Sequence, residues 1–288
     1  MDHDGAGCVP FTKMSGSGND FVVIDHRRPL LSSDQIVPFV RAVCRRGVGI
    51  GADGVVLIET SDDPDVDFRW RYLNADGSVG EMCGNGAMCA GRFAVLNGIA
   101  SSPTRFLTPD GIVTAEIDDP SRPLVRIAVS DPGPIRRERV SVDGCEMEMF
   151  ALQMGVPHAV AIVDDADAFA DAATFARVGR TVRMHDAFAP AGTNFNVISR
   201  VDDHSLRMRT YERGVEAETL ACGTGSVACA VVGVRHGLVD APVTVITSSG
   251  RPLTVTWRDA GDRVTDTWLG GEARVIATGE LHPEGWRD

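Results

Sequence analysis

Residues 81–89 read EMCGNGAMC and residues 220–228 read LACGTGSVA, so the same Cys-Gly-x-Gly unit occurs twice in the chain. Cys222 lies 139 positions after Cys83. The same offset relates Gly98 to Gly237, and it carries NDFVVID (19–25) onto HAVAIVD (158–164). Matches that keep one register over so long a span predict two halves built alike.

Each cysteine unit leads into an apolar segment, AMCAGRFAVL (87–96) in the first half and SVACAVVGV (226–234) in the second. A helix that is apolar nearly all round is a buried helix. Alternating β-type runs such as DGVVLIET (53–60) and SLRMRTYE (205–212) precede these segments, and glycine-containing hairpins follow them. The pattern therefore predicts an α/β (α+β) fold in which strands wrap around a central helix in each half.

Two further helices are expected, one around residues 34–46 and one around residues 166–178. Pro38 lies within the first, so we expect that helix to start later than Ser33 suggests. The stretch VSDPGPIRRERV (129–140) is typical of a linker. We therefore predict a first domain over 1–130 and a second over 131–271, with residues 272–288 returning to the first domain.

Composition excludes several classes of protein. The net charge is −12 and there is no basic block, which argues against a nucleic-acid partner. No apolar run reaches the roughly 18 residues of a membrane span, and the N-terminus lacks the pattern of a secretory signal. We expect a cytoplasmic protein with a short disordered leader. None of the seven cysteines forms a C-x-x-C pair, so we predict neither a metal site nor a thioredoxin-type redox site.

A cysteine just before a glycine-rich helix start meets free backbone N–H groups and the positive end of the helix dipole. Such surroundings lower a thiol pKa and bind anions. Two matched thiols facing one cleft suit proton transfer at a stereocentre, where one removes the α-proton and the other returns a proton to the opposite face. A lone cysteine is most often a small buried hydrophobe. We keep that interpretation for Cys8, Cys44, Cys145 and the mid-helix Cys89 and Cys229.

Several motifs carry a resemblance to a known family. They are FTKMSGSGNDFVVID (11–25), GIGADGVVLIE (49–59), RYLNADGSVGEMCGNG (71–86), GVPHAV (155–160), GTNFNV (192–197) and YERGVEAETLACGTG (211–225). In this order they resemble the diaminopimelate epimerases. The resemblance implies two similar domains, each a β-barrel-like sheet around a central helix, with the active site in the interdomain cleft. It also implies interconversion of LL- and meso-diaminopimelate without pyridoxal phosphate or any other cofactor, and a homodimer is common in the family.

Transferred position by position, the resemblance assigns roles within the site. Cys83 and Cys222 correspond to the catalytic pair, His158 to a residue that tunes it, and Glu212 to a residue near the thiols that also holds an amino group. The backbone of four residues would hold the reacting carboxylate: Gly84, Asn85, Gly223 and Thr224. Four residues would bind the rest of the substrate: Asn19, Asn74, Asn194 and Arg213.

Plainer interpretations stand beside these roles. Asn19 and Asn74 could be turn residues, His158 a satisfied core histidine, and Glu212 with Arg213 a solvated pair. The chain also departs from the family pattern. Val156 replaces a frequent asparagine, Met88 a usual arginine, Gly54 offers no side-chain contact, and the ERGVEAET loop is one residue longer.

Competing functions remain. Another cofactor-free amino-acid racemase of the same fold, for example one acting on histidine, would keep both cysteines but alter the groups at the distal end. A binding protein of this fold would not need both thiols. A dinucleotide site at GSGND (16–20) is excluded, because no G-x-G-x-x-G follows a strand into a helix.

Overall fold

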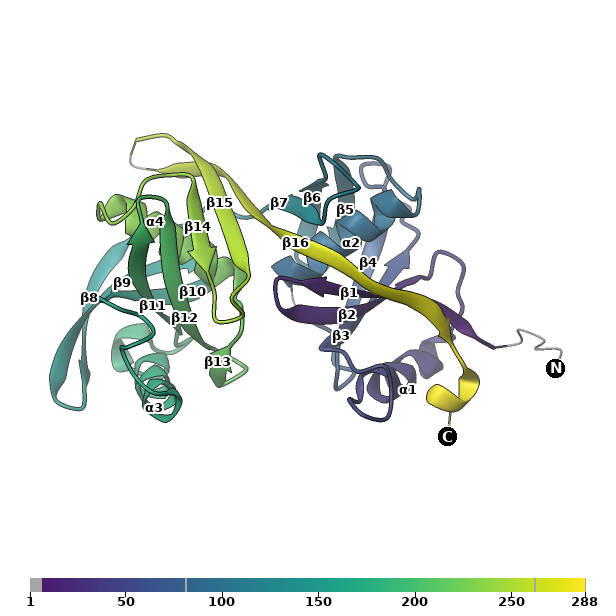
Figure 1. The fold of residues 1–288 in the computed structure, drawn as a ribbon, viewed down its shortest axis with the longest axis horizontal. Helices are drawn as coiled ribbons and strands as arrows, with labels where there is room; N and C mark the ends of the chain where they lie inside the picture. Colours follow the sequence, from purple (N-terminus) through teal and green to yellow (C-terminus); the bar gives the residue numbers. More distant parts are fainter. Residues whose placement is uncertain (1–6, 81, 262, 288) are drawn as a thin grey trace. The chain divides into compact units, whose positions relative to one another are not determined.

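The structure is a computed structural model that describes residues 7–80, 82–261 and 263–287. Most of the predicted leader, residues 1–6, lies outside the described residues. The chain divides into two compact units, one made of residues 1–127 and 271–288 and the other of residues 128–270. Figure 1 shows the course of the chain through both.

In the first unit, hydrogen-bonded neighbours follow the order β1 to β7 and then β16, and β1 also pairs with β16. Among the described residues this closes an eight-stranded barrel. Its strands are β1 (Val9–Gly16), β2 (Asn19–Asp25), β3 (Gly54–Glu59), β4 (Phe68–Asn74), β5 (Thr104–Thr108), β6 (Gly111–Glu116), β7 (Leu124–Ala128) and the C-terminal part of β16 (Val264–Leu281).

In the second unit, the strands follow the order β8, β9, β10, β11, β12, β14, β15 and the N-terminal part of β16. They are β8 (Arg136–Val142), β9 (Cys145–Met154), β10 (Val156–Ile162), β11 (Asn194–Asp202), β12 (Ser205–Glu212), β14 (Val243–Ile246) and β15 (Pro252–Asp259), and the short β13 (Ala217–Thr219) pairs with β12.

The pairing directions repeat between the units. β2 runs parallel to β3, β3 antiparallel to β4, β4 parallel to β5 and β5 antiparallel to β6. The strands β10, β11, β12, β14 and β15 show the same alternation in the same sequence. The predicted likeness of the two halves is therefore present at the level of sheet topology.

A buried helix lies inside each sheet. α2 (Gly84–Leu96) contacts β1, β2, β3, β5 and β6, and α4 (Gly223–Arg235) contacts β9, β10, β11, β12, β14 and β15. Residues 85–94 of α2 and 225–233 of α4 are all buried. Contact with strands on several sides explains why neither helix has a polar face, as the sequence predicted.

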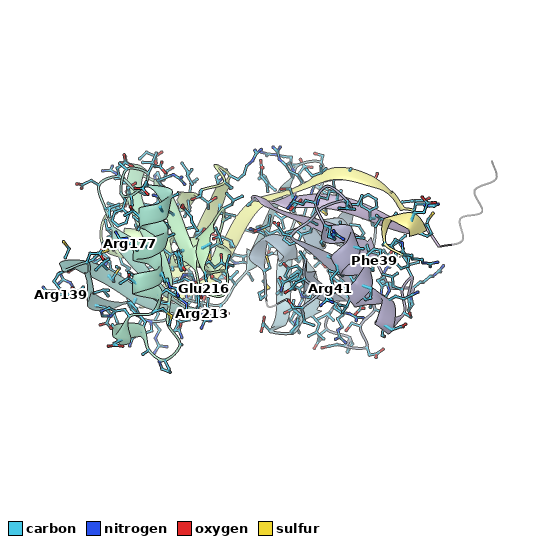
Figure 2. The ribbon with its side chains drawn as sticks, turned by 90° about the horizontal axis from the view of Figure 1, so that it is seen from below. Phe39, Arg41, Arg139, Arg177, Arg213 and Glu216 are labelled. Atoms are coloured by element: carbon cyan, nitrogen blue, oxygen red, sulfur yellow. The ribbon has the colours of Figure 1, made fainter. Side chains whose placement is uncertain are left out.

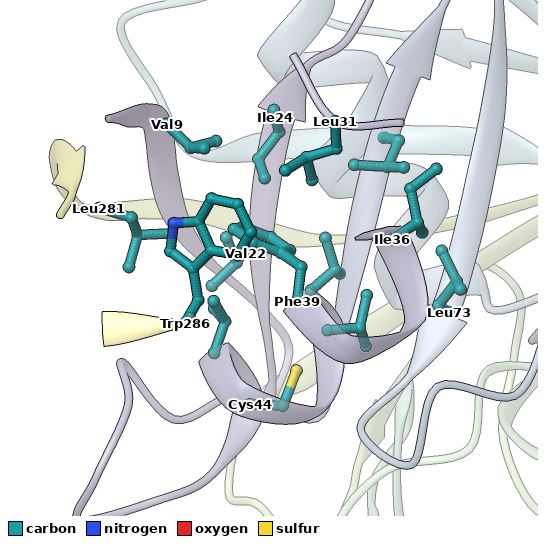
Figure 3. Close-up of a cluster of buried hydrophobic side chains, with 14 of the residues drawn as sticks. Val9, Val22, Ile24, Leu31, Ile36, Phe39, Cys44, Leu73, Leu281 and Trp286 are labelled. Carbon is teal, nitrogen blue, oxygen red and sulfur yellow. The ribbon is translucent and has the colours of Figure 1, made fainter. Parts of the chain in front are cut away.

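The remaining helices pack on the outside of the sheets. α1 (Ser33–Cys44) places Phe39 against Trp286 from the C-terminus, with ring centroids 5.2 Å apart in an edge-on arrangement (Figure 3). The expectation that Pro38 delays this helix was wrong, since the helix begins at Ser33. Pro38 and Asp34 are both exposed. Water can therefore solvate the Asp34 carbonyl that the missing proline N–H leaves without a helical partner.

The second outer helix, α3 (Ala172–Arg183), was predicted about six residues too early. Asp171 caps it, accepting a hydrogen bond from Thr174 N–H at 2.9 Å. The carboxylate of Asp165 accepts hydrogen bonds from the N–H groups of Asp167 and Ala168, which fold that segment into a turn. Phe175 then stacks on Phe195 of β11 at 5.7 Å.

Both buried helices end in the same motif. At the end of α2, Ile99 N–H donates to Ala94 C=O at 2.8 Å and Gly98 N–H donates to Val95 C=O at 3.2 Å. At the end of α4, Leu238 N–H donates to Gly233 C=O at 2.8 Å and Gly237 N–H donates to Val234 C=O at 3.0 Å. The glycines have φ of 64° and 66°. This is a Schellman stop, which requires the left-handed region that glycine adopts without cost.

We predict that Gly98→Ala and Gly237→Ala each reduce the free energy of unfolding by about 1–2 kcal/mol. An added Cβ would meet nothing within 4 Å at either position, so the loss reflects backbone conformation alone. Urea denaturation measures it. Gly285→Ala is the control, because that glycine is also in open space but lacks a positive φ. Equal stability of all three variants would contradict the assigned helix stop.

Candidate active site

Cys83 is the N-cap of α2, with φ −118° and ψ 110°, and its carbonyl accepts the first helical hydrogen bond from Ala87 N–H at 2.8 Å. The N–H groups of the next residues, Gly84 and Asn85, have no partner within the helix. Gly16 at the end of β1 packs directly against this helix start, because a Cβ there would lie 2.5 Å from the Asn85 carbonyl oxygen. The Cys83 thiol therefore lies at the N-terminus of α2, a kind of position that is suited to binding anions.

A chain of polar side chains supports this helix start. Asn85 Nδ2 donates to Asn19 Oδ1 at 2.6 Å, and Asn19 Nδ2 donates to Asp53 Oδ2 at 3.1 Å. Arg46 pairs with Asp53 at 2.9 Å and also with Asp20. The Asn85 side chain is buried, and its Oδ1 has no hydrogen-bond partner among the described residues. The helix start at Cys83 is thus supported by the neutral amide pair Asn19 and Asn85, and the charged groups of Asp53 and Arg46 continue the chain of contacts.

Cys222 is the N-cap of α4, with φ −132° and ψ 113°, close to the values of Cys83. Its side chain is 7% exposed. Its Sγ lies 3.6 Å from Thr224 Oγ1, and its carbonyl accepts from Ser226 N–H at 2.9 Å. Position 225 favours glycine, because a Cβ added there would lie 3.1 Å from the Cys222 sulfur.

His158 is linked to the Cys222 thiol through the Thr224 hydroxyl. Its Nε2 is 3.0 Å from Thr224 Oγ1 and its Nδ1 is 3.1 Å from Asn196 Nδ2. Burial lowers the pKa of His158 to about 3, and the charge of Arg213 acts in the same direction. The imidazole is therefore neutral near pH 7. It can donate or accept a hydrogen bond, but it is not a proton reservoir.

Three other predicted site residues meet where β11, β12 and the following turn come together. Asn194 Oδ1 accepts from the backbone N–H of Arg213 at 2.8 Å, and its Nδ2 donates to Pro157 C=O at 3.1 Å. Burial raises the pKa of Glu212. Arg213 and Glu216 both project from this turn (Figure 2). The turn thus places a cationic and a buried acidic side chain in the same unit as Cys222.

Asn74 is the last residue of β4 and opens the turn that follows it, close to the turn role that one interpretation of the sequence allowed. Its backbone N–H donates to Ser78 C=O at 2.9 Å and its Nδ2 to Ser78 Oγ at 3.0 Å. It remains half-buried. Among the described residues of this turn, none donates a hydrogen bond to the amide oxygen of Asn74, so that oxygen can accept from other partners.

Comparison with known proteins shows the family of this chain. The sequence model of the diaminopimelate epimerase family matches residues 11–134 and 150–276. The chain is 42% identical over 283 residues to a diaminopimelate epimerase of Aquifex aeolicus, covering 96% of this chain and 99% of the relative, and 41% identical over 252 residues to one of Hydrogenobaculum sp.. This chain belongs to the diaminopimelate epimerase family. It is accordingly an enzyme of the isomerase class.

The fold is shared more widely. The structure of a probable proline racemase from Agrobacterium radiobacter K84, with bound carbonate, superposes with a TM-score of 0.67 over 95% of this chain and 93% of that chain. The two sequences are 14% identical, so the likeness concerns the fold alone.

The departures from the epimerase pattern have local explanations. Met88 is fully buried within α2, among the core side chains of the first unit. A Cβ on Gly54 would lie 2.5 Å from both the Tyr72 ring and the Leu73 carbonyl oxygen, so the neighbouring tyrosine fills that space. Val156 is the half-buried first residue of β10 and pairs with Met154. Packing therefore accounts for Met88 and Gly54.

Sequence reasoning missed Asp53, Asn196 and Thr210. Asn196 follows Asn194 by two residues on β11, so both side chains lie on one face of the strand, and that period was the available signal. Among the residues described, no group of three or more His, Cys, Asp or Glu side chains could hold a metal ion. In the same part of the chain, no helix has the length and apolar composition needed to cross a membrane.

We predict that His158 makes stability depend on pH. Because its pKa falls from about 6.5 in the unfolded chain to about 3 in the folded one, the unfolded state binds the extra proton. Its contribution is complete above pH 6.5 and is lost as the pH falls from 6.5 towards 3, by up to about 1.4 kcal/mol per pH unit. Urea unfolding at several pH values measures the slope.

His158→Gln should flatten that slope, whereas His204→Gln, which changes an exposed histidine, should retain it. An unchanged slope in His158→Gln would show that the buried imidazole is not the group responsible.

Proposed function

We propose that this enzyme interconverts LL- and meso-diaminopimelate without pyridoxal phosphate, using Cys83 and Cys222 as a thiolate and thiol pair. The observation that carries the proposal is the matched position of the two cysteines. Each is the extended N-cap of a helix buried inside its own sheet, with φ and ψ agreeing within about 15°. The names of the curated relatives supply the substrate.

In the proposed reaction, one sulfur begins as a thiolate and removes the α-proton, leaving the electron pair on the α-carbon. The other sulfur begins as a thiol and donates its proton to the opposite face of that carbon. The configuration inverts, and the two sulfurs exchange protonation states. Because the reverse reaction exchanges their roles, each group has to act as both acid and base, and two like groups such as two cysteines suit this requirement.

The α-carboxylate would accept hydrogen bonds from the N–H groups of Gly84, Asn85, Gly223 and Thr224. As the α-proton leaves, negative charge develops on this carboxylate, and the helix N-termini stabilise it there. Glu212 would hold the ammonium group. Partial burial raises the pKa of its carboxyl, and only the ionised form would pair with the ammonium group, so activity should fall as this carboxyl becomes protonated.

The distal end of diaminopimelate is a second amino-acid head with both charges. Asn19, Asn74, Asn194 and Arg213 would bind it. This set favours diaminopimelate over the simpler amino acids of other racemases. In this proposal the two units correspond to the two halves of the epimerase. The enzyme would be a cytoplasmic homodimer. Its product would serve the synthesis of lysine and of peptidoglycan precursors.

We predict that Cys83→Ala and Cys222→Ala each lower epimerisation of LL-diaminopimelate by at least about 10³-fold, because each removes one proton-transfer group. Activity is measured in deuterium oxide by NMR, following the α-proton and the formation of the meso isomer with no cofactor added. Circular dichroism checks that the variants are folded.

Cys145→Ala is the matched control, since Cys145 is exposed and unassigned, and it should retain full activity. Substantial turnover in either active-site variant would refute the two-thiol mechanism. Equal exchange rates across a panel of simpler amino acids would refute the assigned substrate while leaving the mechanism intact.

We also predict that mild oxidation inactivates the enzyme by joining Cys83 to Cys222. Two sulfurs that reach the same carbon should come close enough to form a disulfide, which consumes both acid–base groups. Peptide mapping identifies the linkage, and a reductant should restore activity. Bound substrate should slow the reaction. Inactivation that leaves both cysteines free for alkylation would contradict this prediction.

A further inference from the structure

A continuous row of hydrogen-bonding side chains leads from the middle of the second sheet to Cys222. It passes through Thr210, Asn196, His158 and Thr224, and its first three members are at most 1% exposed. All four residues and the thiol belong to one unit. Donors and acceptors that are so completely buried have no water with which to exchange partners, so the direction of each hydrogen bond can be worked out.

Asn196 has one possible orientation. Its Nδ2 lies 3.3 Å from the Ala159 carbonyl oxygen, which can only accept. The opposite end, Oδ1, accepts from Thr210 Oγ1 at 2.9 Å. The amide nitrogen is therefore the group that faces His158, 3.1 Å from Nδ1.

The orientation of Asn196 decides the state of the imidazole. A donor facing Nδ1 requires a lone pair there, so the ring proton of neutral His158 lies on Nε2. Nε2–H then donates to Thr224 Oγ1 at 3.0 Å. Since the threonine oxygen accepts this bond, its own proton is directed elsewhere, and Cys222 Sγ lies 3.6 Å away.

We propose that Asn196 is a positioning residue that fixes the Nε2–H tautomer of His158, and that this tautomer turns the Thr224 hydroxyl into a hydrogen-bond donor to Cys222. Thr210 is the residue that holds Asn196 in place. A hydroxyl that donates to sulfur favours the thiolate over the thiol. The inference rests on the proposed function only for the use to which the thiolate is put.

The arrangement is specific to the second half of the chain. The offset of 139 relates Phe21 to Val160, and these residues pair with Gly54 and Asn196 respectively. Asn196 thus occupies the strand position of Gly54, where the Tyr72 ring fills the corresponding space. Because the equivalent position in the first half is a glycine, the shared fold does not by itself explain why an asparagine is found at position 196.

The tautomer can be read directly from ¹H–¹⁵N correlation spectra of the histidine rings, with His158 identified by comparison with His158→Gln. The native protein should show neutral His158 protonated on Nε2. Asn196→Asp replaces the donor by an acceptor of equal size, and the spectrum should then show a proton on Nδ1. Asn97→Asp makes the same change at an exposed amide and should leave the His158 signals unchanged.

The effect on sulfur is tested by the rate at which iodoacetamide alkylates Cys222 at pH 7, measured by mass spectrometry of its peptide. Thr224→Val removes the hydroxyl at nearly constant volume and should slow alkylation about threefold. The fraction of Cys222 present as thiolate becomes smaller, and the greater nucleophilicity of that thiolate offsets this loss only in part. Thr224→Ser should restore the native rate.

A proton on Nδ1 in the native protein, or unchanged His158 signals in Asn196→Asp, would overturn the assigned tautomer. Equal alkylation rates in native enzyme and Thr224→Val would overturn the link to sulfur. Neither measurement uses substrate, so both can succeed even if the enzyme fails to epimerise diaminopimelate, and that failure would count against the proposed function alone.

Discussion

A helix buried on all sides must begin somewhere inside the protein, and its first N–H groups then have no helical partner. This constraint organises both units. α2 and α4 each lie within a sheet, and each begins at a cysteine followed by Gly-x-Gly. A side chain at the second glycine of either unit would press on a neighbour, the Trp70 ring at Gly86 and the Cys222 sulfur at Gly225. In the proposed function, the N–H groups of these helix starts bind the substrate carboxylate, and a cysteine sulfur lies beside each of them.

Much of the fold could be predicted because the signals for the buried helices are local and occur twice. The apolar runs at 87–96 and 226–234 define the helix interiors, and Gly98 and Gly237 define their ends. The central strands β2, β3, β10 and β11 contain continuous buried, mostly apolar runs, because the buried helix covers one face and an outer helix covers the other. A repeated pattern at a fixed offset supports each buried helix with its partner in the other half.

The outer helices were predicted less well because their limits depend on capping and exposure rather than on periodicity. The start of α3 is decided by the Asp171 carboxylate, and the apparent helical period before it belongs to a turn made by Asp165. Pro38 is tolerated because it lies on the exposed side of α1. The supporting residues of the site were missed for a related reason. Asp53 and Asn196 gain their roles from the strand register, which places them beside Asn19 and His158 and which no short motif records.

The two cysteine environments differ in their supporting residues, which bears on the symmetric reaction proposed for them. Asn19 pairs with Asn85 in the first unit, and the residues one offset later, His158 and Thr224, form the same contact in the second. The first contact is backed by Asp53 and Arg46, and the second by the neutral amide of Asn196. In the proposed mechanism each reacting group must serve as both acid and base, and both groups are sulfur. This mechanism does not require the supports to be alike, because each has only to bring its thiol to a workable pKa. Different residues at equivalent positions therefore conflict with neither the repeat nor the reaction.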